Sequence, residues 1–162
     1  MPNRIGTTTL SKSGQTTSPR YDVTIQSDPA QIAAVRKNVE DIAQTAGLDE
    51  QGVAEVGLCV NEALANVIRH AYGGVKDRPI VVSAYCQEEG LVVTIRDWGS
   101  GVNPASLPPK PYDPLEPGGL GLICLWRMMS QVSYLPQGDG MLLEMKKHKQ
   151  SPTAGTKSGA RP

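Results

Sequence analysis

The longest regular pattern in this sequence is a helical repeat that carries three polar side chains along one face. Apolar residues recur every three or four positions between residues 49 and 72, which is the spacing of a helix buried on one side. Glu62, Asn66 and His70 follow one another at intervals of four, so their side chains share a face. The pattern predicts a central helix over 49–72, although for any one polar residue alone a solvated helix surface is the simpler interpretation.

The segments around this helix have the patterns of strands and of two further helices. The expected strands are 21–25, 80–86, 91–97, 132–135 and 141–145. Helical spacing predicts a helix at about 32–46 and another that opens at residues 118–122 and ends at Met129. This order of elements predicts an α/β fold, a two-layer sandwich whose mainly antiparallel mixed sheet is covered on one face by helices.

The two ends of the chain differ in composition from its middle. Residues 1–19 are rich in Thr, Ser and Gly, and the residues from 148 onward are rich in Pro, Gly and Ser. Such segments bury too little apolar surface to offset the entropy lost on ordering. We therefore expect disordered tails at 1–19 and 148–162, and between them one domain of residues 20–147.

Charge and composition exclude several classes of function. The chain has 16 basic and 16 acidic residues and no Phe, so neither its charge nor its aromatic content favours direct binding to nucleic acid. No apolar run approaches the roughly 20 residues of a membrane span, and we expect a cytoplasmic protein without a membrane partner. Cys59, Cys86 and Cys124 are widely spaced in apolar segments and are expected to be buried free thiols.

A short aspartate and glycine motif marks the end of the third expected strand. Asp97 can accept a hydrogen bond from an amine, and Gly99 and Gly101 would let a ring or a phosphate approach the backbone. A proline-rich loop of residues 98–117 follows, and a loop of that length is typical of a lid or a binding loop. Taken alone, the motif is better explained by an ordinary turn at a strand end.

A second glycine motif precedes the last expected helix. It consists of Gly118, Gly119, Leu120 and Gly121. Exposed backbone N–H groups at a helix N-terminus can bind an anion, and a linker into a core helix is the alternative interpretation. The motif is neither a Walker loop nor a dinucleotide fingerprint, because it lacks the Lys of the first and the βαβ setting of the second.

In this order and at these separations, the motifs resemble those of a known superfamily. The N, G1 and G2 boxes of the GHKL, or Bergerat-fold, ATPases are similar to Glu62-x-x-x-Asn66, Asp97-x-Gly99-x-Gly101 and Gly119-x-Gly121. Within that superfamily the chain resembles the small anti-sigma-factor serine/threonine kinases of the RsbW/SpoIIAB type. The resemblance extends over about residues 21–147.

The resemblance implies ATP and Mg²⁺ as ligands and assigns a role to each box. It implies that Asn66 ligates Mg²⁺ beside the phosphates, that Glu62 is the general base for a serine or threonine hydroxyl, and that Asp97 binds the adenine amine. His70 would contact the nucleotide or be a structural histidine. The glycine motifs would pass close to the nucleotide and line its phosphates, and residues 98–117 would form the ATP lid.

The resemblance also implies partners. A kinase of this type would bind a sigma factor, phosphorylate a STAS-domain anti-sigma-factor antagonist, and form a homodimer. One alternative is a non-catalytic ATP-binding module that only sequesters a partner, and the side chain of Glu62 distinguishes it from a kinase. Another is an ATPase or a histidine-kinase-like catalytic fragment, and the expectation of a single small domain counts against it.

Overall fold

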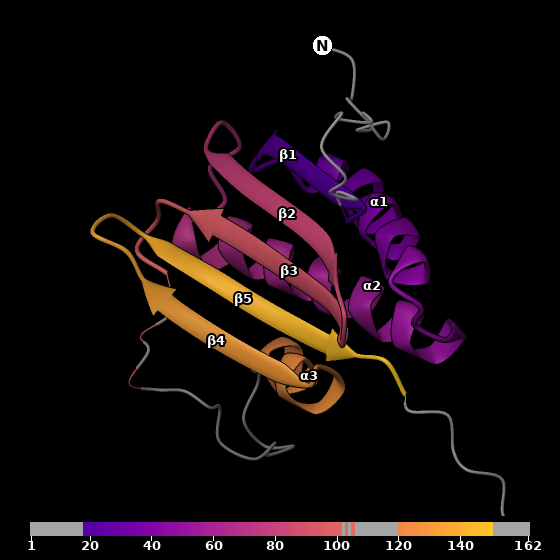
Figure 1. The fold of residues 1–162 in the computed structure, drawn as a ribbon. Helices are drawn as coiled ribbons and strands as arrows, with labels where there is room; N and C mark the ends of the chain where they lie inside the picture. The colour runs from indigo at the N-terminus through magenta and orange to yellow at the C-terminus, as the bar shows by residue number, and fades with distance from the viewer. Residues whose placement is uncertain (1–17, 102, 104, 106–119, 151–162) are drawn as a thin grey trace, which may run out of the picture.

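The computed structural model describes residues 18–101, 103, 105 and 120–150. Helices pack on one face of a sheet in this part of the chain (Figure 1). The strands are β1 (Arg20–Gln26), β2 (Pro79–Gln87), β3 (Gly90–Asp97), β4 (Gln131–Pro136) and β5 (Met141–His148). The helices are the 3-10 turn η1 (Pro29–Gln31), α1 (Ile32–Thr45), α2 (Glu50–Asn66), the π-helical η2 (Val67–Ala71) and α3 (Leu120–Met128).

The sheet has the strand order β1-β2-β3-β5-β4, and each of its pairings is antiparallel. Because β5 inserts between β3 and β4, the end of β3 lies beside the start of β5. Helix α2 runs behind the middle of the sheet, and α1 packs beside it (Figure 1). The predicted two-layer α/β fold is confirmed, and the strand pairings of the described residues are antiparallel throughout.

The core lies between the sheet and helices α1 and α2. Val56, Val60 and Leu64 of α2 are fully buried, as the apolar spacing of this helix predicts. The helix begins where the sequence places its cap, because the Asp49 side chain accepts a hydrogen bond of 2.8 Å from the Gly52 amide. At 25 cal/mol per Å² of apolar surface, each such side chain contributes roughly 1.5–3 kcal/mol to stability.

The last turn of the central helix differs from the prediction. Instead of a regular α-helix to Tyr72, the chain widens into the π-helical turn η2, in which the Tyr72 amide donates to the carbonyl of Val67. The Tyr72 hydroxyl donates to the Pro79 carbonyl at 2.6 Å and accepts from the Trp98 amide at 2.8 Å. These bonds tie the end of the helix to the starts of β2 and of the loop after β3.

The first strand of the described residues begins at Arg20, and the last strand ends at His148. Strand β5 continues to His148, one residue beyond the predicted end of the domain, although its last residues are polar. Lys147 can occupy an inward position because its ammonium group pairs with Glu55 on α2 and donates to the carbonyl of Met128, near the C-terminus of α3. Almost all of both predicted tails lies outside the described residues.

The three cysteines are free, but only Cys59 is buried, whereas Cys86 and Cys124 are partly exposed. Burial raises the pKa of the Cys59 thiol to about 12, so this residue behaves as a core side chain rather than a nucleophile. Within the described residues, no helix has the length and apolar character needed to cross a membrane.

Candidate functional site

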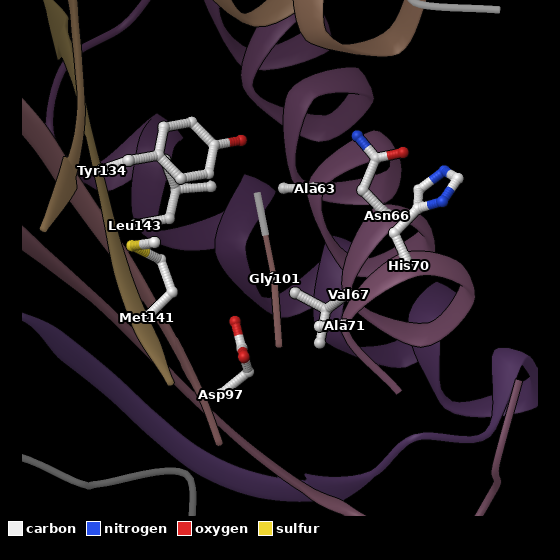
Figure 2. A pocket seen from close by; sticks show the side chains of 10 residues that line it. All are labelled: Ala63, Asn66, Val67, His70, Ala71, Asp97, Gly101, Tyr134, Met141 and Leu143. Atoms are coloured by element: carbon white, nitrogen blue, oxygen red, sulfur yellow. The ribbon is translucent and has the colours of Figure 1, made fainter. Parts of the chain in front are cut away.

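A pocket opens between the C-terminal end of the central helix and the end of the sheet where β3 meets β5. It contains about 350 Å³ of space free of atoms, open solvent at its mouth included. Figure 2 shows the polar side chains of Asp97 and Tyr134 on the sheet side, and those of Asn66 and His70 on the helix side. The lining residues are Ala63, Asn66, Val67, His70, Ala71, Asp97, Gly101, Tyr134, Met141 and Leu143.

Asp97 is the last residue of β3, and its carboxylate lies at the base of this pocket (Figure 2). The residue is only 3% exposed. The Gly99 amide donates a hydrogen bond of 2.9 Å to Oδ1, and no other described residue donates to the carboxylate. Burial raises the pKa of Asp97 above its ordinary value, while the Gly99 amide and the charge of Arg96 act in the opposite direction. The second oxygen is left available to an amine in the pocket.

The loop after Asp97 is held against the β4–β5 turn by Arg96. Its guanidinium donates to the backbone carbonyl and to the carboxylate of Asp139, at 2.6 and 2.8 Å. The same group lies 4.5 Å from the centre of the Trp98 ring, a cation–π contact. Arg96 thus joins two turns that are far apart in sequence and flank the pocket.

The sheet side of the pocket contains residues that sequence reasoning missed. Tyr134, Met141 and Leu143 come from the last hairpin, where Met141 pairs with Asp97 and Tyr134 pairs with Leu143. Alternation in that hairpin predicts which residues face inward, but only the strand order shows that they face this pocket.

Glu62 and Asn66 lie on one face of the central helix, as the spacing predicts. A Cβ atom added at Gly121 would come 2.6 Å from Oε2 of Glu62 and 3.6 Å from the amide nitrogen of Asn66. Both side chains therefore reach the first turn of α3, and a side chain at position 121 would displace the Glu62 carboxylate from its present place. Asn66 lines the pocket, whereas Glu62 is not among its lining residues.

His70 and Arg69 occupy different positions on the widened turn η2. The imidazole of His70 is exposed and lies beside Asn66 at the mouth of the pocket (Figure 2). Arg69 is exposed as well, and its guanidinium donates to the carbonyl of Ala65 rather than lining the pocket. Of the two, His70 is the residue that lines the pocket.

The glycines of the two motifs have different surroundings. Gly101 lines the pocket and has a φ of +59°, a left-handed conformation that favours glycine. Gly99 instead packs on the backbone of Ala71, and the neighbouring Ser100 amide donates to the Ala71 carbonyl at 3.2 Å. Leu120 is 53% exposed at the start of α3. Gly118, Gly119 and most of the predicted lid lie outside the described residues.

Replacing Gly99 by Ala is expected to lower the free energy of unfolding by about 1–3 kcal/mol, as overpacking does. The new Cβ would lie 2.6 Å from the carbonyl carbon and 2.7 Å from the Cβ of Ala71, and the backbone there is held by hydrogen bonds. Urea denaturation measures the change. Gly138→Ala is the matched control, because no atom lies within 4 Å of its added Cβ. Equal stabilities of the two variants would contradict the tight packing at Gly99.

The hydrogen-bond acceptors and oxygen ligands at this site fit a purine nucleotide and a hard cation. The apolar lining and the buried carboxylate at the base of the pocket suit the chemistry of an aromatic ring that carries an amine. Asn66 and Glu62 offer oxygen ligands, which Mg²⁺ prefers. Among the described residues, no group of three or more His, Cys, Asp or Glu side chains is placed to hold a metal ion, so a cation here would depend on ligands such as phosphate oxygens and water.

The chain is similar to known proteins in sequence. A family model described as the histidine kinase-like ATPase domain matches residues 25–147. The serine-protein kinase RsbW of Listeria monocytogenes is 28% identical over 128 residues, which are 74% of this chain and 81% of that protein. RsbW of Halalkalibacterium halodurans is 28% identical over 136 residues, 78% of this chain and 81% of that protein.

A solved structure shares the fold. The RsbU and RsbW domains of a protein from Mycobacterium tuberculosis superpose with a TM-score of 0.59 at 15% identity. The match covers 85% of this chain but only 34% of that longer chain. At this identity the likeness concerns the fold alone.

Proposed function

The chain belongs to the histidine kinase-like ATPase domain family, and from this premise we propose that it is an ATP-dependent protein serine/threonine kinase. Its curated relatives are serine-protein kinases, which supports phosphoryl transfer to a protein. We further propose that it is a cytoplasmic, homodimeric anti-sigma factor that binds a sigma factor and phosphorylates a STAS-domain antagonist. These partners follow from the resemblance of its boxes to those of the RsbW/SpoIIAB type.

One observation carries this proposal: Glu62 and Asn66 meet the first turn of α3 beside the pocket that contains Asp97. A nucleotide whose base lies on Asp97 would have its phosphates directed towards this junction. The position of the junction supports a base and a metal ligand acting on the same phosphate, since one helical turn separates the two residues.

The resemblance assigns a role to each residue, and the chemistry of each side chain supports that role. Asp97 accepts a hydrogen bond from the adenine amine and holds the base in the pocket. Asn66 offers its carboxamide oxygen to Mg²⁺, which when bound would neutralise charge on the phosphate oxygens. Glu62 would accept the proton of the incoming serine or threonine hydroxyl as that oxygen attacks the terminal phosphorus, the bond from that phosphorus to the bridging oxygen breaks, and ADP leaves. Gly121 leaves space for the Glu62 carboxylate.

The two tryptophans of the chain allow a direct test of nucleotide binding. Trp98 follows Asp97 directly, and Trp126 stacks on the pocket residue Tyr134. ATP with Mg²⁺ is expected to change the intrinsic fluorescence in a saturable way, and chelation of Mg²⁺ is expected to weaken that binding. Radiolabelled ATP should then transfer its γ-phosphate to a serine or threonine of a STAS-domain protein from the same genome. Absence of saturable binding by both fluorescence and calorimetry would contradict the proposal.

A further inference from the structure

Tyr134 brings a phenol hydroxyl to the pocket from β4, the edge strand of the sheet. Its hydroxyl points towards the space between the helix side and the sheet side (Figure 2). No described residue forms a hydrogen bond with this hydroxyl, although the Tyr134 side chain is partly buried. A polar group in this position is suited to a ligand that enters the pocket.

The hydroxyl acts as a donor at neutral pH. Burial, reinforced by the charge of Asp97, raises the pKa of Tyr134 to about 12. Both groups line the same pocket (Figure 2). A protonated phenol can donate to a ring nitrogen, whereas the carboxylate of Asp97 can only accept.

The ring of Tyr134 is held in place by a neighbour on α3. The ring of Trp126 lies parallel to it, with 4° between the planes and 5.7 Å between the centroids. Such a stacked pair restricts rotation of the side chain, so the hydroxyl is already oriented before a ligand binds. Helix α3 also meets Glu62 of α2 at Gly121. The stack of Trp126 on Tyr134 therefore connects the pocket to the helix that contacts Glu62.

The arrangement of strands separates the two polar groups of the sheet side. Strand β5 lies between β3 and β4, and Asp97 and Tyr134 pair with positions of β5 that are two residues apart, so their backbones are roughly 12 Å apart at the usual spacing and rise of strands. Met141 and Leu143 of β5 form an apolar surface between them. A planar base lying on this surface would have an acceptor at one end and a donor at the other.

We propose that the Tyr134 hydroxyl donates a hydrogen bond to a ring nitrogen of the purine and so fixes the orientation of a base that Asp97 holds by its amine. This inference rests on the proposed function, since it requires that a purine nucleotide binds in the pocket. A single contact to Asp97 would let the base pivot, and a second contact from another strand prevents the pivoting. Tyr134 is therefore a base-positioning residue that the sequence motifs do not include.

The test compares Tyr134→Phe with the wild type. The substitution removes only the hydroxyl and keeps the stack on Trp126, and the loss of one hydrogen bond is expected to weaken ATP binding about fivefold. Tyr85→Phe is the matched control, because Tyr85 contacts Arg20 and does not line the pocket. Calorimetric titration with ATP and with its 1-deaza, 3-deaza and 7-deaza analogues, each lacking one ring nitrogen, identifies the acceptor.

One analogue should bind the wild type about as weakly as ATP binds the variant, and should bind both proteins equally. If Tyr134→Phe binds ATP like the wild type, or weakens all three analogues by the same factor as ATP, the proposed contact is wrong while nucleotide binding stands. If the wild type binds none of these nucleotides, the proposed function itself fails.

Discussion

Asp97→Asn is expected to weaken ATP binding roughly 10- to 100-fold, the loss associated with a hydrogen bond to a charged group. The carboxylate has one oxygen occupied by the Gly99 amide and the other free for the adenine amine. An asparagine of the same size offers only one acceptor, so it can satisfy the glycine amide or the adenine amine but not both. Calorimetric titration of the purified variant with ATP and Mg²⁺ measures the effect.

The free protein provides a check that the variant is folded. Because burial raises the pKa of Asp97, ionisation at neutral pH destabilises the free protein relative to an exposed carboxylate. This penalty is absent at low pH, where the carboxyl group is protonated in both the folded and the unfolded protein. It develops as the pH rises from the ordinary pKa of an aspartate to the raised pKa of Asp97 in the folded protein. Asp97→Asn removes it, so the unfolding temperature at pH 7 is expected to be equal to or higher than that of the wild type.

Asp41→Asn is the control for a change of charge alone, because Asp41 is an exposed residue of α1 that pairs with Lys37. It is expected to bind ATP like the wild type. Unchanged affinity in Asp97→Asn would contradict the assignment of the base pocket. A fall in both affinity and unfolding temperature would instead point to a structural role for the carboxylate.

Glu62→Gln is expected to reduce phosphoryl transfer by about 10²- to 10⁴-fold while leaving the affinity for ATP nearly unchanged. The substitution keeps the shape of the side chain against Gly121 and removes the ability to accept a proton. Single-turnover transfer from labelled ATP to a STAS-domain substrate measures the rate, and fluorescence titration measures the affinity. Glu50→Gln, at the exposed start of α2, is the control for the loss of one carboxylate.

The outcomes separate the kinase from its alternatives. Transfer at the wild-type rate by Glu62→Gln would exclude Glu62 as the general base. If the wild type binds ATP but phosphorylates no STAS-domain protein, the non-catalytic module that sequesters a partner becomes the better explanation. Hydrolysis of ATP without transfer to a protein would favour an ATPase.

Much of the fold could be predicted because its elements have clear local patterns. The strands and helices begin and end within a few residues of the predicted positions. The spacing of apolar residues, the capping residues and the glycines that set these boundaries act over only one or two turns of the chain, so the local sequence is enough to find them. The π-helical turn at Val67–Ala71 gives no such signal, because the hydrogen bonds of Tyr72 to Pro79 and Trp98 stabilise it from outside the helix. Likewise, the inward position of the Lys147 side chain gives no local signal, because its partners Glu55 and Met128 are distant in sequence.

The sequence alone determined the residues whose relation is local: Glu62 and Asn66 share a helix face by their spacing, and Asp97 ends a strand whatever that strand pairs with. Only the tertiary structure decided that Tyr134 and Met141 complete the pocket, and that Gly99 packs on Ala71 instead of lining it. The physical reason is that helix faces are set by the backbone period, whereas contacts between distant segments depend on strand order and register.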